Sequence, residues 1–80
     1  MATIEILSPL PGIFYHRPSP DEPLFKSPGD PVAIGDVIGL VEIMKSFNDV
    51  KAECTGTFQR YAVGHGEEIM PGQPLAVVEA

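Results

Sequence analysis

The residue best suited to chemistry is Lys45, which follows Met44 at a predicted hairpin turn between two halves of the chain that repeat each other. A protonated lysine is a poor nucleophile, but an enzyme that removes its proton can acylate it. Tight hairpin turns favour Asn-Gly or Asp-Gly because their central residues need positive φ, so Met-Lys is a poor local choice. A local preference broken without evident gain marks a candidate functional site.

The repeat sets the framework around this lysine. Residues 29–42 align with residues 66–79 without a gap, at an offset of 37 positions, and the match includes glycines, apolar positions and a final glutamate. Residues 12–14 match residues 56–58 at an offset of 44. A unit of this size cannot bury its own apolar face. We therefore expect the two copies to pack against each other about a two-fold axis, with Lys45 at the joint between them.

The difference between the two offsets places seven extra residues in the first half, within residues 16–23. Pro18, Pro20 and Pro23 each fix φ and remove a backbone donor, so this segment does not belong inside a sheet. We interpret it as a stiff, extended finger that stands off the body of the fold. An ordinary surface loop is the alternative.

Short apolar runs rich in β-branched residues, separated by glycine and proline, predict an all-β domain. The expected strands are residues 4–7, 12–15, 31–34, 37–43, 46–53, 57–63, 68–70 and 74–79.

Residues 40–51 are ambiguous, because their apolar positions also fall at the spacing of an amphipathic helix. No Asp, Asn, Ser or Thr stands near residue 39 to cap such a helix. The repeat also equates residues 40–42 with the strand that ends the chain. We predict a hairpin: a strand to about Ile43, a turn at Met44 and Lys45, and a second strand from about Ser46.

Composition limits the function. Eighty residues predict one domain, residues 1–80. A net charge of −6 with only five basic residues argues against nucleic-acid binding. Cys54 is the only cysteine, so no internal disulfide forms, and no apolar run is long enough to cross a membrane. With no leader visible, the sequence predicts a cytoplasmic protein. The two histidines lack metal-ligand spacing, and no nucleophile–base pair points to a catalytic residue.

The motifs resemble those of a known family. Glu42-Ile-Met-Lys-Ser46 resembles the Glu-Ala-Met-Lys-Met signature of biotinyl domains. The stretch Ser8-Pro-Leu-Pro-Gly-Ile-Phe-Tyr15 resembles the corresponding stretch of the biotin carriers of bacterial-type acetyl-CoA carboxylase, and Pro18-Ser-Pro-Asp21 resembles their protruding thumb. The resemblance covers essentially the whole chain. Ser46 departs from it, because the family often has Met or Leu after the lysine.

The resemblance implies a flattened β-barrel, or hammerhead, of two four-stranded antiparallel sheets with pseudo-two-fold symmetry. It implies that a biotin protein ligase joins biotin to Lys45, in a hairpin of residues 42–47 where Glu42, Met44 and Ser46 flank it. Biotin then carries carboxylate from a biotin carboxylase to a carboxyltransferase, for malonyl-CoA formation and fatty acid synthesis. We further hypothesise that Met44 helps the partner enzymes accept the turn.

The resemblance also assigns a role to the finger, residues 16–23, as a thumb that lies near biotin and restricts its motion. Removal of residues 17–23 is then expected to leave the fold intact and to impair the carrier. The thumb residues are His16, Arg17, Pro18, Ser19, Pro20, Asp21 and Glu22.

On this interpretation the chain is a carrier with no catalytic activity of its own. Two alternatives remain open. A lipoyl carrier shares the fold, although lipoyl domains usually have Asp-Lys-Ala at the turn. A small acidic β-barrel could instead bind a protein partner without any cofactor. The sequence leaves the acceptor of the carboxyl group open, since acetyl-CoA follows only from the thumb.

Overall fold

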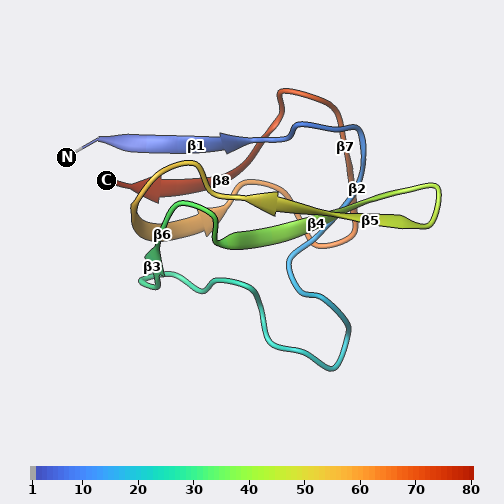
Figure 1. The fold of residues 1–80 in the computed structure, drawn as a ribbon, viewed down its shortest axis with the longest axis horizontal. Coiled ribbons are helices and arrows are strands. Elements are labelled where there is room, and N and C mark those ends of the chain that lie inside the picture. Colours follow the sequence, from blue (N-terminus) through green and yellow to red (C-terminus); the bar gives the residue numbers. More distant parts are fainter. Residues whose placement is uncertain (1) are drawn as a thin grey trace.

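A computed structural model describes residues 2–80, and every regular element in them is a β-strand (Figure 1). The strands form two four-stranded antiparallel sheets, one in the order β1-β8-β6-β3 and the other in the order β5-β4-β2-β7. The predicted all-β class and the hairpin at residues 40–51 are therefore confirmed. The strands are β1 (Thr3–Leu7), β2 (Gly12–Tyr15), β3 (Pro31–Val32), β4 (Val37–Ile43), β5 (Ser46–Lys51), β6 (Gly56–Tyr61), β7 (Glu67–Ile69) and β8 (Pro74–Glu79).

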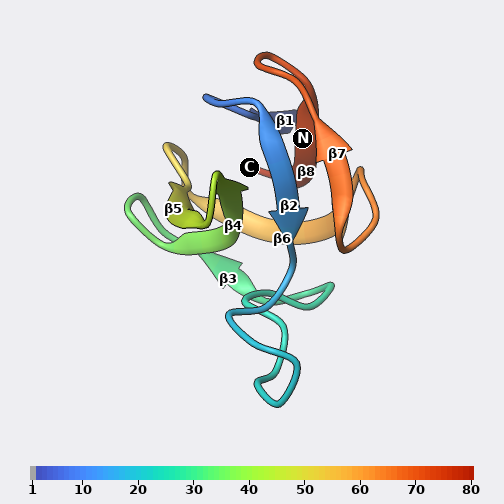
Figure 2. The same cartoon turned by 90° about the vertical axis from the view of Figure 1, so that its right-hand side faces the viewer.

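The sequence repeat matches each strand of one sheet with a strand of the other sheet. The offsets of 44 and 37 match β1 with β5, β2 with β6, β3 with β7 and β4 with β8. Applied to the order β1-β8-β6-β3, this substitution gives β5-β4-β2-β7, which is the order observed in the second sheet. Figure 2 shows how the sheets curve around a common interior. The expected pseudo-two-fold arrangement of a flattened barrel is present.

Equivalent turns use equivalent hydrogen bonds. The amide of Ala33 donates to Asp36 Oδ2 at 2.9 Å, and the amide of Met70 donates to Gln73 Oε1 at 3.0 Å. The first of these bonds explains where β3 ends. Because the Asp36 carboxylate draws Ala33 into the turn, β3 stops at Val32, two residues before the predicted end of that strand. Side-chain acceptors of this kind commonly satisfy backbone donors in turns.

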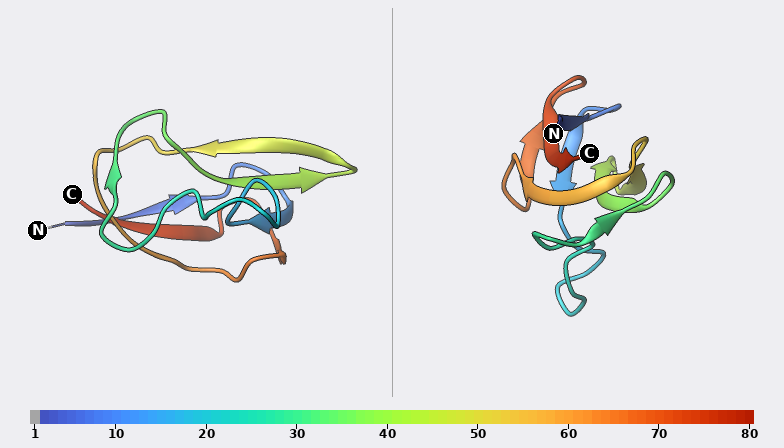
Figure 3. Two further views of the ribbon diagram at one scale, coloured as in Figure 1. Left: turned by 90° about the horizontal axis from the view of Figure 1, so that it is seen from below. Right: turned by 90° about the vertical axis from the view of Figure 1, so that its left-hand side faces the viewer.

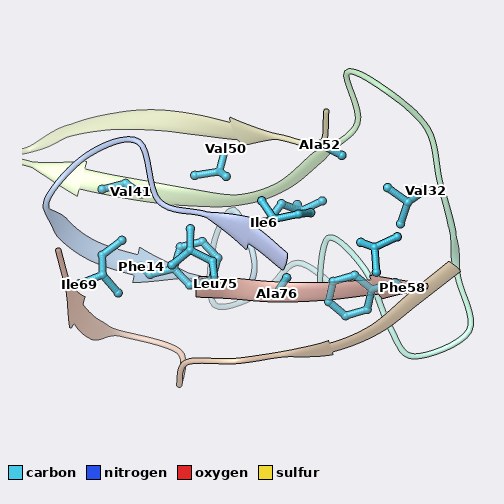
Figure 4. Close-up of a cluster of buried hydrophobic side chains, with 12 residues drawn as sticks. Ile6, Phe14, Val32, Val41, Val50, Ala52, Phe58, Ile69, Leu75 and Ala76 are labelled. Atoms are coloured by element: carbon cyan, nitrogen blue, oxygen red, sulfur yellow. The ribbon is translucent and has the colours of Figure 1, made fainter. Parts of the chain in front are cut away.

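The core lies between the sheets and is built from residues that the repeat makes equivalent (Figure 4). Phe14 and Phe58 are fully buried, one from each central strand β2 and β6. Along most strands the core residues are flanked by more exposed ones, as a pleated strand with one buried face requires. Strand β8 differs, because its residues 75–78 are all buried, which covers it on both faces. The equivalent buried pairs are Ile6 and Val50, Phe14 and Phe58, Val32 and Ile69, Ile38 and Leu75, and Val41 and Val78.

The segment between β2 and β3 carries the seven extra residues and stands away from both sheets (Figure 2). Its base is closed by the amide of Phe25, which donates to the carbonyl oxygen of His16 at 2.9 Å. A turn near its tip is closed by the amide of Glu22, which donates to the carbonyl oxygen of Ser19 at 3.1 Å. We call residues 17–24 the thumb loop. It doubles back on itself rather than running straight.

The chain ends and the turn between β4 and β5 lie at opposite ends of the molecule. Thr3 pairs with Glu79, so both ends of the described chain lie together, and the turn between β4 and β5 lies at the opposite end (Figures 1 and 3). The longest extent of the molecule is 38 Å. Residues 2–80 include no helix of the length and hydrophobicity that a bilayer span requires.

Candidate functional site

The site begins with the turn that joins β4 to β5. Ile43 pairs with Ser46, which leaves Met44 and Lys45 as the two central residues. Their φ angles are 49° and 69°, both positive, as a type I′ turn requires. The side chain of Met44 is 94% exposed, and that of Lys45 is exposed as well. Non-glycine residues adopt this conformation at a cost, so two in succession are consistent with a functional constraint.

The hairpin holds the lysine clear of the barrel. Six residue pairs join β4 to β5, and β4 is in turn paired with β2 at its other edge. Within the described part of the chain the one salt bridge joins Lys26 to Asp36, and no hydrogen bond involves Lys45 Nζ. The turn that carries Lys45 lies at the end of the molecule farthest from the chain ends (Figure 3), so the unpaired amine is presented there.

Glu42 lies three residues before the lysine and is fixed by an aromatic side chain. The hydroxyl of Tyr15, at the end of β2, donates to Glu42 Oε1 at 2.7 Å. This bond raises the pKa of Tyr15 above its ordinary value, because ionisation of the phenol would place two negative charges together. Phe47, which pairs with Glu42 across the hairpin and is 59% exposed, has its ring 6.1 Å from that of Tyr15.

A hollow of about 250 Å³ separates the thumb loop from the hairpin. The polar and charged side chains that line it are those of Arg17, Ser19 and His65. Its aromatic lining comes from Tyr15 and Phe47. Aromatic walls with a few polar groups are common in small-ligand sites, and this hollow is smaller than the roughly 300–1,000 Å³ of a typical one. The residues that line it are Tyr15, Arg17, Pro18, Ser19, Pro20, Leu40, Phe47 and His65.

His16 anchors the base of the thumb loop to the barrel instead of forming part of its free end. Its ring stacks on Tyr61 with centroids 3.7 Å apart, and Nε2 lies 2.8 Å from the carbonyl oxygen of Val63. Its backbone amide donates to His65 Nδ1 at 2.9 Å. Burial lowers the pKa of His16 below its usual value, and burial raises the pKa of Tyr61 to about 12. Both side chains are therefore neutral at pH 7, which suits a packed anchor.

The structure divides the residues singled out from the sequence into three places. Glu42, Met44, Lys45 and Ser46 belong to one hairpin. Arg17, Pro18, Ser19 and Pro20 line the hollow beside it. Asp21 and Glu22 are exposed at the tip of the thumb loop, and His16 lies at its base.

Four residues that line the hollow were not predicted as site residues: Tyr15, Leu40, Phe47 and His65. The alternation along β2 was a usable signal for the first, since Phe14 faces the core and its neighbour must face outward. No comparable signal pointed to His65, which is 49 positions from its partner His16. Across residues 2–80 no group of three or more His, Cys, Asp or Glu residues is arranged to hold a metal ion.

Comparison with known proteins places this chain in a family. A family model described as "Biotin-requiring enzyme" matches residues 4–78. The biotin carboxyl carrier protein of acetyl-CoA carboxylase from Chlamydia trachomatis is 41% identical over 70 residues, which are 88% of this chain and 43% of that protein. The protein of the same name from Pyropia yezoensis is 38% identical over 74 residues, 92% of this chain and 47% of that protein.

A third relative, the chloroplastic biotin carboxyl carrier protein of acetyl-CoA carboxylase 2 from Arabidopsis thaliana, is 37% identical over 71 residues, 89% of this chain and 28% of that protein. The chain thus spans less than half the length of these relatives. Among solved structures, urea carboxylase from Kluyveromyces lactis matches 99% of this chain and 6% of its own, with a TM-score of 0.78 and 23% identity. This structural likeness supports the fold described above.

Proposed function

Because the chain belongs to the biotin-requiring enzyme family, we propose that it is a biotin carboxyl carrier domain, residues 1–80, with biotin joined through an amide to Lys45. The observation that carries this proposal is the unpaired, exposed Lys45 at the centre of a type I′ turn, at the end of the molecule opposite the chain ends. The residues fit the group, because nothing in the described chain obstructs or neutralises the amine.

Attachment is an acyl transfer. The deprotonated Nζ of Lys45 attacks the acyl carbon of a biotinyl-adenylate on a biotin protein ligase, the C–N bond forms, and AMP departs with the acyl–phosphate electron pair. When bound, biotin supplies a ureido nitrogen that accepts and releases carboxylate. The chain itself holds the tether at the tip of a rigid hairpin, which raises the effective concentration of the carried group at each partner.

The partners follow from the relatives. We place the domain between a biotin carboxylase and a carboxyltransferase, as the non-catalytic carrier of an acetyl-CoA carboxylase that forms malonyl-CoA for fatty acid synthesis. The names of three relatives support this assignment. The proposal locates the protein in the cytoplasm, where a fold with one cysteine needs no disulfide. Neither nucleic acid nor a membrane has a part in it.

The proposal is tested by intact mass. After co-expression with a biotin protein ligase and excess biotin, we expect one biotinyl group per chain, located at Lys45 by peptide mapping. Parallel co-expression with a lipoyl ligase and lipoate is expected to give unmodified protein. A lipoyl adduct without a biotinyl one would establish the lipoyl alternative, and no adduct from either ligase would favour the cofactor-free binding module.

The hollow gives the thumb loop a proposed role in confining the biotinyl group. Replacement of residues 17–24 by two glycines leaves a four-residue turn in which the Phe25 amide can still donate to the His16 carbonyl. We expect this variant to keep its unfolding midpoint within a few degrees and to be biotinylated at Lys45. Carboxyl transfer to the acceptor, followed with ¹⁴C-bicarbonate, is expected to fall roughly tenfold, since orientation is lost.

The control for the thumb experiment is Asp21→Ala with Glu22→Ala, which changes only the exposed tip of the loop. That variant is expected to transfer carboxylate at the wild-type rate. Wild-type transfer by the two-glycine variant would show that the thumb loop does not act on biotin.

A further inference from the structure

Tyr15 is the only side chain that hydrogen-bonds to Glu42 within residues 2–80. The two residues are 27 positions apart in sequence, and both project from the outer face of the sheet that carries the hairpin, opposite to the buried Phe14 and Val41. The ring of Tyr15 lies between Phe47, with centroids 6.1 Å apart, and His65, with centroids 5.4 Å apart. The phenol is therefore held in place on both sides while its hydroxyl reaches the carboxylate.

The type of donor matters. A lysine or arginine at position 15 would hold Glu42 and also cancel its charge. A tyrosine hydroxyl holds the carboxylate but leaves its negative charge in place, and the raised pKa keeps this hydroxyl protonated. No salt bridge involves Glu42 in the described chain. A fixed anionic group, with Oε2 unpaired, thus stands three residues before the lysine, on the face that also exposes Phe47.

We propose that Tyr15 is a positioning residue for attachment at Lys45: it fixes the Glu42 carboxylate as the anionic contact that a basic group on the biotin protein ligase binds. The inference rests on the proposed function and adds the recognition chemistry of the same hairpin. Tyr15 acts through Glu42 and never touches the reacting atoms, so its loss affects binding of the carrier and leaves the acyl transfer step intact.

The test is the kinetics of biotin incorporation with purified ligase at varied concentrations of the unbiotinylated carrier. Tyr15→Phe keeps the ring contacts and removes the hydroxyl. We expect its KM to rise roughly 3- to 10-fold, which is less than the full value of a hydrogen bond to a charged group because this bond positions Glu42 and is not itself made to the ligase, with kcat within about twofold of wild type. Glu42→Gln still accepts the hydroxyl but lacks the charge, so its KM is expected to rise at least as much.

A double-mutant cycle shows whether the effect passes through Glu42. In a Glu42→Ala background, Tyr15→Phe is expected to change KM by less than about twofold. The matched control is Tyr61→Phe, which removes a phenol hydrogen bond of the same length. This bond runs 2.7 Å from Tyr61, in β6 of the other sheet, to the carbonyl oxygen of Ile38, at the end of β4 away from the turn. Its KM is expected to equal the wild-type value.

Two results would overturn the inference: wild-type kinetics for Tyr15→Phe, or an equal rise in KM with and without Glu42. A rise shared by Tyr61→Phe would point to general destabilisation and would overturn it as well, and unfolding midpoints measured on the same samples identify that case. Failure of the proposed function is distinct, because wild-type carrier would then acquire no biotin at all.

Discussion

Lys45→Arg is expected to abolish biotin attachment completely. The guanidinium group keeps the positive charge and a similar length, but it is not deprotonated at accessible pH and so offers no nucleophilic nitrogen. The hairpin itself should be unchanged, because Lys45 makes no side-chain hydrogen bond in the described structure and is exposed. Intact mass after co-expression with the ligase is expected to show unmodified protein only.

A variant with the two turn residues exchanged, Met44→Lys with Lys45→Met, shows whether position within the turn matters. Both residues have positive φ, and Met44 is 94% exposed, so the exchange preserves charge, composition and accessibility. It moves the amine by one residue, about 3.8 Å along the backbone. We expect the rate of biotin incorporation to fall roughly 100-fold, since acyl transfer depends on near-attack geometry. A wild-type rate would mean that the ligase needs only an exposed lysine.

Substitution of Gly12 or Gly56 by alanine is expected to destabilise the fold severely. A methyl group at Gly12 would overlap the carbonyl oxygen of Glu42, and one at Gly56 would overlap that of Glu79. In both cases the obstacle is backbone of the paired strand, which moves only if a sheet moves. We expect each variant to lose at least about 3 kcal/mol in the free energy of unfolding, the upper end of the usual cost of overpacking, because backbone yields less readily than a side chain.

Gly64→Ala is the control for that prediction, because an added methyl group there meets only the Glu67 side chain, with 3.7 Å to the nearest atom. Its free energy of unfolding, measured in urea, is expected to match the wild type within about 0.5 kcal/mol. Gly12 and Gly56 are equivalent in the repeat, so their losses should be similar. A stable Gly56→Ala variant would show that the strands can separate at this point without cost.

The repeat made most of the fold predictable. Two copies of one unit, each with an apolar face, bury those faces most simply by packing against each other. Each strand of one sheet therefore has its repeat mate in the other sheet. Strand ends were less predictable, because they depend on side-chain acceptors such as Asp36 and Gln73 that draw the backbone into turns. The hairpin at residues 43–46 was predicted because its repeat mate ends as a strand and because no capping residue near position 39 supports a helix.

The sequence by itself determined the class of fold, the hairpin and the position of Lys45 within it, since all three depend on residues close together in the chain or on its internal repeat. The tertiary structure decided what surrounds that lysine. Tyr15 reaches Glu42 across 27 positions, and His16 meets His65 across 49. Such contacts form because the curved sheets and the closed thumb loop bring strands together that are distant in sequence. The spacing of residues along one strand shows which face they share, but not which distant residues they meet.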